Sequence, residues 1–303
     1  MAELDWVQYW FMFPISIGVA TTAMLSGIGG AALFIPIFVI IFPILGPEYP
    51  LTTAAAIGSA LLTEVFGFSS GFVGYYRKKL IDFHSAIPFL IVSVPIAILG
   101  AIMLATMKEQ EVFLKGLYAL LMLLPCPIIL RHTPHDKITD SKQIVGEQKL
   151  NSKIIRTITA KDGHIYKYDK PRLGVFGVFT TGIGSFLTGL LSVGIGEVIM
   201  PQLVKRNRIP VAVAAATSVF IVIITIASAS FTQVTALIAA GGVNAIPWNL
   251  VVYTVPAVVI GGQIGPRLQG KISQRTMEKI IAILFGIIGI SMGFIVVRQL
   301  DFF

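Results

Sequence analysis

Two glycine-rich breaks, one in each half of the chain, contain the residues best suited to binding a ligand. The first is Ser26-Gly27-Ile28-Gly29-Gly30 and the second is Ser192-Val193-Gly194-Ile195-Gly196. Each lies inside a long apolar stretch, where a broken helix leaves backbone N–H and C=O groups without partners. N–H groups at a helix start favour an anion, and glycine allows it to approach closely. We therefore expect anion binding at Gly29, Gly30, Gly194 and Gly196. The alternative is that these glycines only permit close helix packing.

Hydroxyl side chains near the breaks could donate to the same anion. They are Ser26, Ser59, Ser69, Ser70, Ser192, Thr217 and Ser218. Ser59 and Ser218 are the better candidates, because they end two similar segments, 54–59 and 213–218. Serine and threonine in membrane helices also commonly bond to their own backbone, and that reading stays open for each of them.

Two acids lie in strongly apolar surroundings. Glu64 is near the middle of segment 51–76, and Glu197 directly follows the second break. A charge at the centre of a membrane helix costs about 2.5–3.5 kcal/mol, and such residues usually face a cavity or relay protons. We expect Glu64 and Glu197 to serve proton coupling or the substrate site. The alternative is a neutral, hydrogen-bonded glutamate that braces helices.

The composition indicates a polytopic membrane protein. The chain is 55% hydrophobic and 13% charged, with a mean hydropathy of +0.84, whereas soluble domains carry about 25% charged residues. The single cysteine excludes an internal disulfide and a thiolate metal cluster. The net charge of +8 is attributed to cytoplasmic loops rather than to nucleic-acid binding. No cofactor or metal is expected.

Two similar halves should position these residues. Residues 1–130 form the first predicted repeat, 131–172 a polar connector with a short hairpin around 161–164, and 173–303 the second repeat. Each repeat begins with an apolar stretch that is too long for one crossing and is broken at its centre, about 10–43 and 173–204. Three apolar segments follow each stretch, at about 51–76, 85–107 and 112–130, then 211–239, 247–266 and 275–297.

The charge pattern favours inverted repeats. If each broken stretch returns to its own side as a hairpin, 20 of the 23 Lys and Arg residues share one face, and only Lys108, Lys115 and Arg298 lie on the other. If each stretch crossed once, the repeats would be parallel and the split would be 14 to 9. The apolar segments predict an all-α fold. The positive-inside rule places both termini outside and the connector in the cytoplasm. Whether the hairpin arms cross the membrane completely stays open.

Inverted repeats with interrupted helices are typical of secondary transporters. We therefore expect an active anion transporter, not an enzyme, with its substrate between the two hairpin tips. One alternative is a passive anion channel of the same fold. A membrane-embedded enzyme or sensor is another, but it would need a polar catalytic cluster.

The chain resembles the TauE/SafE-type anion permeases. The resemblance rests on Ser26–Gly30 before Ile35-Pro36, on Ala56–Ser59 and Ala215–Ser218, on Gly74–Asp82, and on Gly261–Leu268. It implies a cell-membrane transporter, with export the favoured direction, of small sulfur-containing anions such as sulfite, sulfoacetate or other organosulfonates, driven by an ion gradient. Two departures are Glu197 after Gly196, where the family usually continues with glycine, and the long connector.

Overall fold

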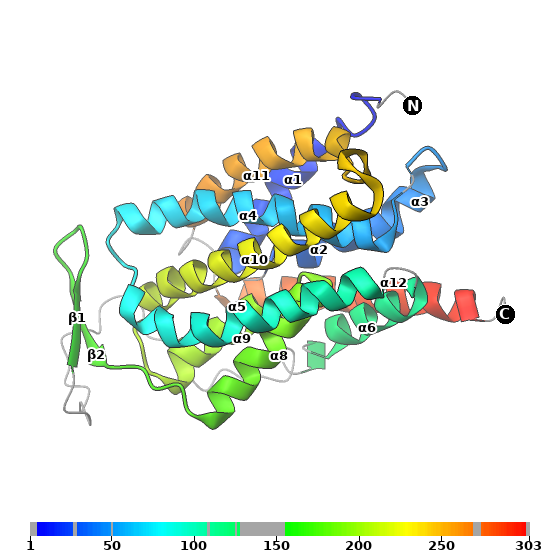
Figure 1. Ribbon diagram of the computed structural model, residues 1–303. Coiled ribbons are helices and arrows are strands. Elements are labelled where there is room, and N and C mark those ends of the chain that lie inside the picture. Colours follow the sequence, from blue (N-terminus) through cyan, green and yellow to red (C-terminus); the bar gives the residue numbers. More distant parts are fainter. Residues whose placement is uncertain are drawn as a thin grey trace.

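The protein is a bundle of helices with one small β-hairpin (Figure 1). The computed structural model describes residues 5–26, 29–49, 51–107, 110–124, 126–127, 155–268 and 274–300. The first half contains α1 (Met12–Ser26), α2 (Ala31–Pro36), η1 (Ile37–Ile41), α3 (Phe42–Leu45), α4 (Thr53–Arg77), α5 (Phe83–Thr106) and α6 (Glu111–Leu123).

The rest of the described chain begins with the hairpin and continues with a second series of helices. The strands are β1 (Ile155–Thr159) and β2 (Ile165–Asp169). The helices are α8 (Val175–Leu191), α9 (Ile195–Pro201), η2 (Gln202–Arg206), α10 (Val211–Gly241), η3 (Val243–Ala245), α11 (Trp248–Leu268) and α12 (Gln274–Leu300).

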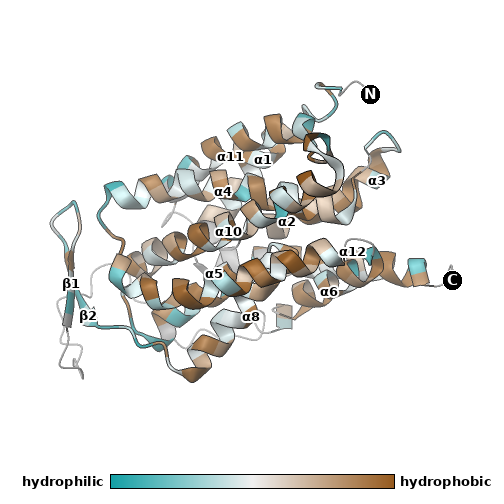
Figure 2. Ribbon diagram, in the orientation of Figure 1, coloured by the Kyte–Doolittle hydropathy of each residue, from teal (hydrophilic) through white to brown (hydrophobic). Residues whose placement is uncertain are grey.

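This is an all-α membrane protein. Among the described residues, five helices are long and apolar enough to cross a membrane, namely α4, α5, α10, α11 and α12. Figure 2 shows hydrophobic residues along the helices and hydrophilic residues mainly at their ends and in the hairpin. In Figure 1 the C-terminal end of α12 lies at the end of the bundle opposite β1 and β2.

Both long apolar stretches are interrupted at their glycine-rich breaks. Here α1 ends at Ser26 before α2 begins at Ala31, and α8 ends at Leu191 before α9 begins at Ile195. In each case the second arm changes from α-helix to π-helix after a proline, Pro36 or Pro201. Because proline has no N–H, the carbonyl four residues earlier loses its helical partner.

The helices of the two halves pack through matching contacts. Helix α1 packs along α11 as α8 packs along α5, and α4 packs along α11 as α5 packs along α10. Glycines allow close approach at these crossings: a Cβ on Gly100 would come within 2.3 Å of a carbonyl oxygen in α8, and one on Gly261 within 2.6 Å of a carbonyl oxygen in α1. Small residues allow such close backbone contact in membranes.

Hydroxyl pairs follow the same pattern. Thr63 of α4 bonds to Thr254 of α11 at 2.9 Å, and Ser93 of α5 bonds to Thr225 of α10 at 2.8 Å. All four residues are buried. Paired hydroxyls satisfy each other where no water is present, so these bonds brace the crossing helices that hold the breaks in place.

The β-hairpin confirms the turn predicted around 161–164 and is attached to the helical bundle. Its strands pair antiparallel, from Ile155 opposite Asp169 to Thr159 opposite Ile165. The buried Tyr168 hydroxyl donates to Oδ2 of Asp82 at 2.7 Å, while Asp82 caps α5 by accepting from the Ser85 N–H at 3.1 Å. Burial and the adjacent Asp82 carboxylate raise the pKa of Tyr168.

Substitution of Tyr168 by phenylalanine should loosen this attachment. Tyr168→Phe leaves the ring in place and removes one donor to a buried carboxylate, which should lower stability by about 1–2 kcal/mol. Thermal unfolding of detergent-purified protein measures the loss. Tyr166→Phe, on the same strand but only partly buried, is the matched control. Equal midpoints for both variants and the wild type would show that the hydroxyl contributes nothing.

Candidate functional site

The two interrupted helices meet at their breaks through one carboxyl group. The N–H of Gly29 donates to Oε1 of Glu197 at 3.3 Å, and the N–H of Gly194 donates to Oε2 of the same side chain at 3.0 Å. A Cβ on Gly29 would also lie 3.8 Å from the carbonyl oxygen of Ser192. Glu197 therefore joins two chain segments that are 168 residues apart in sequence.

A second carboxyl group reaches the same place from α4. Glu64 is 3% exposed, and its carboxyl group interacts with the N–H groups of Gly30 and Ala31 at the start of α2. A Cβ on Gly29 would come within 2.8 Å of its Oε1. Oε2 of Glu64 is buried and has no hydrogen-bond partner among the described residues. The Glu64 and Glu197 carboxyl groups are close enough to interact electrostatically.

Local bonds explain the shape of the second break. Ser192 ends α8 in the left-handed conformation, with φ of 61°, and Gly194 follows with φ of 140°. The Ser192 hydroxyl donates to the carbonyl of Ile57 in α4 at 3.2 Å. The N–H of Ile195 donates to the Thr188 hydroxyl at 2.7 Å. These contacts hold the first turn of α9 against α4 and α8, which places Glu197 beside the first break.

The first break is braced by a residue that the sequence analysis did not single out. Tyr118 of α6 is 1% exposed, and its hydroxyl donates to the carbonyl of Ala32 at 2.8 Å. Ala32 is four residues before Pro36, so Tyr118 supplies the donor that the proline lacks. Tyr118 is also within electrostatic range of Glu64 and Glu197. The signal in the sequence was a tyrosine inside the apolar segment 112–130, because a tyrosine hydroxyl buried there needs a hydrogen-bond partner.

The remaining predicted site residues are placed as follows. Ser59 is 2% exposed and its hydroxyl has no partner among the described residues. The Thr217 hydroxyl accepts from the N–H of Asp82 at 3.0 Å, and the Ser218 hydroxyl donates to the carbonyl of Ala215 at 2.9 Å. Gly196 is buried in the first turn of α9, whereas the side chain of Ser26 lies outside the described part. The hydroxyl groups of Thr217 and Ser218 thus bond to groups other than Glu64 and Glu197 in this conformation.

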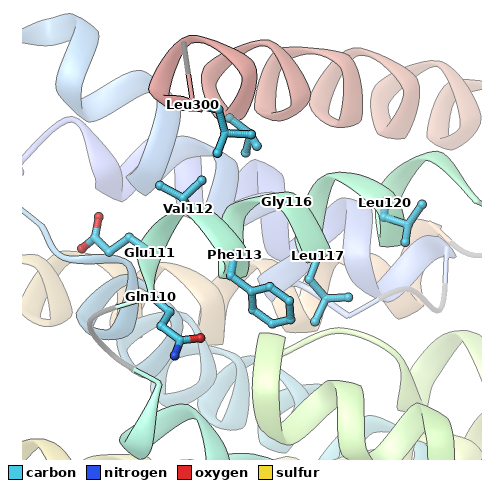
Figure 3. A pocket seen from close by; sticks show the side chains of 9 residues that line it. Gln110, Glu111, Val112, Phe113, Gly116, Leu117, Leu120 and Leu300 are labelled. Carbon is cyan, nitrogen blue, oxygen red and sulfur yellow. The ribbon is translucent and has the colours of Figure 1, made fainter. Parts of the chain in front are cut away.

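A groove that includes no residue of either glycine-rich break lies between α6 and α12 (Figure 3). Its walls are mostly apolar, and Gln110 and Glu111 are its polar members. None of the predicted site residues lines it. Among the described residues, no cluster of three or more His, Cys, Asp or Glu side chains is placed to hold a metal ion.

Comparison with known proteins agrees with this architecture. The family described as "Sulfite exporter TauE/SafE" matches residues 12–292, which include both breaks and both acids. The chain belongs to the TauE/SafE family. It is also 26% identical over 271 residues to the "Probable membrane transporter protein YunE" of Bacillus subtilis (strain 168), a match covering 89% of this chain and 91% of that protein. No solved structure matches it.

The structure predicts that alanine substitutions at Gly194 and Gly30 affect the stability of this TauE/SafE member differently. A Cβ on Gly194 would meet the carbonyl oxygen of Gly184 at 2.6 Å, and φ of 140° is strained for any other residue. Gly194→Ala should therefore lower stability by at least about 2 kcal/mol. Gly30 has φ of −60°, and the nearest atom to its Cβ would be 3.7 Å away, so Gly30→Ala should change stability by less than about 1 kcal/mol.

Thermal unfolding and the yield of monodisperse protein in detergent compare these two variants. If Gly194→Ala were as stable as Gly30→Ala, the close approach of α8 and α9 at the second break would be contradicted.

Proposed function

We propose that this protein is a secondary active transporter of small sulfur-containing anions, such as sulfite, sulfoacetate or other organosulfonates, in the cell membrane, with export as the favoured direction. The observation that carries the proposal is the meeting of two helix starts at Glu197, deep in an apolar bundle. The family description names sulfite export, and an oxyanion suits a cluster of backbone N–H donors.

The proposed substrate site lies between the two hairpin tips. Its donors are the N–H groups of Gly29, Gly30, Gly194 and Gly196, with hydroxyl groups from Ser26, Ser59 and Ser192. The hydroxyl groups of Ser192, Thr217 and Ser218 are engaged in other bonds in this conformation, so they join the site only after those bonds are exchanged. Binding through backbone dipoles and hydroxyls, without a basic side chain, gives the moderate affinity that release requires.

Two inverted repeats, 1–130 and 173–303, are the proposed basis of alternating access. Three observations support them: equivalent helices of the two halves make matching contacts, the hydroxyl pairs match, and the inverted arrangement places 20 of the 23 basic residues on one face. In this arrangement both termini are outside, the 131–172 connector is cytoplasmic, and the hairpins enter from opposite faces. Movement of the hairpins and their supporting helices would open the tips to each side in turn.

Substrate class and coupling are tested in proteoliposomes. The protein should bind and move sulfite, sulfoacetate and methanesulfonate in preference to acetate, because three oxygens on sulfur can engage donors from both breaks. An imposed pH step should drive uphill transport. Preference for acetate would overturn the sulfur assignment, and transport that only follows the anion's own gradient would favour a passive channel.

The topology is tested by accessibility of short epitope tags in intact cells. Tags at Met1 and Phe303 should react with antibody from outside, whereas a tag within 131–154 should react only after permeabilisation. A connector that is accessible from outside would contradict the inverted arrangement, whatever the substrate.

A further inference from the structure

The protein's own carboxyl groups occupy the donors that the proposed site offers to an anion. Glu197 accepts from the N–H groups of Gly29 and Gly194. Glu64 interacts with those of Gly30 and Ala31. The helical arms that start here extend over Ala31–Leu45 and Ile195–Val204. An external anion can reach the same N–H groups only after these carboxyl groups have moved aside.

No basic side chain that the structure describes balances these acids. The helices and turns packed against α4 are α1, α2, η1, α6, α10 and α11, and those packed against α9 are α8, α10 and η2. Apart from Glu64 and Glu197, the ionisable residues on all of these elements and on α4 are Tyr75, Tyr76, Arg77, Glu111, Lys115, Tyr118, Lys205, Arg206, Tyr253 and Arg267.

The bases in this set whose side chains the structure describes are either paired or exposed. Lys115 forms an ion pair with Glu111 at 3.2 Å. Arg77, Arg206 and Arg267 are exposed, and the side chain of Lys205 lies outside the described part. Tyr118 is the remaining titratable group within range of both acids. Its hydroxyl is committed to the Ala32 carbonyl.

Electrostatics then limits the charge of the site. A buried and a partly buried carboxylate that lie together without a counter-ion repel strongly, so the pair holds at most one negative charge. Four N–H dipoles suffice to stabilise that one charge. A substrate anion brings another negative charge into the same space. Its binding therefore requires that the remaining carboxylate be neutralised.

We propose that Glu64 and Glu197 together act as an internal substitute for the substrate, and that an anion binds only as the pair takes up one proton. This inference rests on the transport function proposed above. The proton adds to the carboxylate and forms a carboxylic acid, which releases the N–H donors and can itself donate an O–H to the anion. The site then holds one anionic ligand at all times, either the shared carboxylate or the substrate. Anion and proton cross in the same direction.

The charge of the substrate then determines which gradient drives it. A monovalent sulfonate moving with one proton carries no net charge, so an inward proton gradient drives it into the cell. A divalent anion with one of its two charged groups at the tips, moving with one proton, carries one net negative charge, so an inside-negative potential favours its export while an inward proton gradient opposes it. One coupling rule thus permits export of divalent anions and uptake of monovalent ones.

Proton uptake on binding tests the proposal directly. Purified protein in weakly buffered detergent, mixed with methanesulfonate and a pH-indicator dye, should take up one proton per anion bound. Above the pH at which the pair titrates, affinity should fall about tenfold per pH unit. The double variant Glu64→Gln/Glu197→Gln should bind with no proton uptake and with an affinity independent of pH. Glu48→Gln removes an exposed acid and should behave as the wild type does.

If the double variant fails to fold, proton uptake by the wild-type protein tests the proposal by itself. Methanesulfonate binding without proton uptake would overturn the coupling and leave the transport function standing. Failure of methanesulfonate, sulfoacetate and sulfite all to bind at any pH would overturn the transport function, and the coupling with it.

A vesicle experiment tests the same rule by charge. With valinomycin and a tenfold potassium gradient, the equilibrium distribution of sulfoacetate should change about tenfold, while that of methanesulfonate should not change. A methanesulfonate distribution that follows the potential would mean that no proton accompanies it, and would overturn the proposal.

Discussion

The carboxyl group of Glu197 bonds to both broken helices, and the arrangement of the membrane interior depends on this contact. A helix that stops inside an apolar bundle exposes N–H groups that neither lipid nor water can satisfy. Here two such helix starts face each other, and the carboxyl groups of Glu197 and Glu64 satisfy their donors from within the protein. Under the proposed function, an anion would take the place of these carboxyl groups.

The rest of the fold can be understood as support for this meeting point. Gly100 and Gly261 let α8 and α1 pack closely on α5 and α11. Tyr118 compensates the carbonyl that Pro36 leaves free, so the second arm keeps its position despite the change to π-helix. At the other end of α5, Asp82 links the helix start to α10 and to the β-hairpin. Contacts between residues that are far apart in sequence thus hold the two glycine-rich breaks together.

Much of this could be predicted from local patterns. Excess length and central glycines predicted that both apolar stretches would be interrupted, and the two acids stood out because charge is costly in a membrane. Which groups meet depends on tertiary packing, and periodicity contains no such information. Three hydrogen bonds could therefore not be predicted: that of the Gly29 N–H to Glu197, that of Tyr118 to Ala32, and that of the Asp82 N–H to Thr217. The N–H groups of Gly29, Gly30 and Gly194 were predicted as anion donors, and in the structure they interact with carboxyl groups of the protein itself.

The most direct test of this account is an experimental structure of the protein with a bound sulfonate, determined at low pH. The account predicts that the anion contacts the N–H groups of Gly30 and Gly194, with the carboxyl groups of Glu64 and Glu197 displaced from them. An anion bound elsewhere, with Glu197 still joining Gly29 to Gly194, would contradict it.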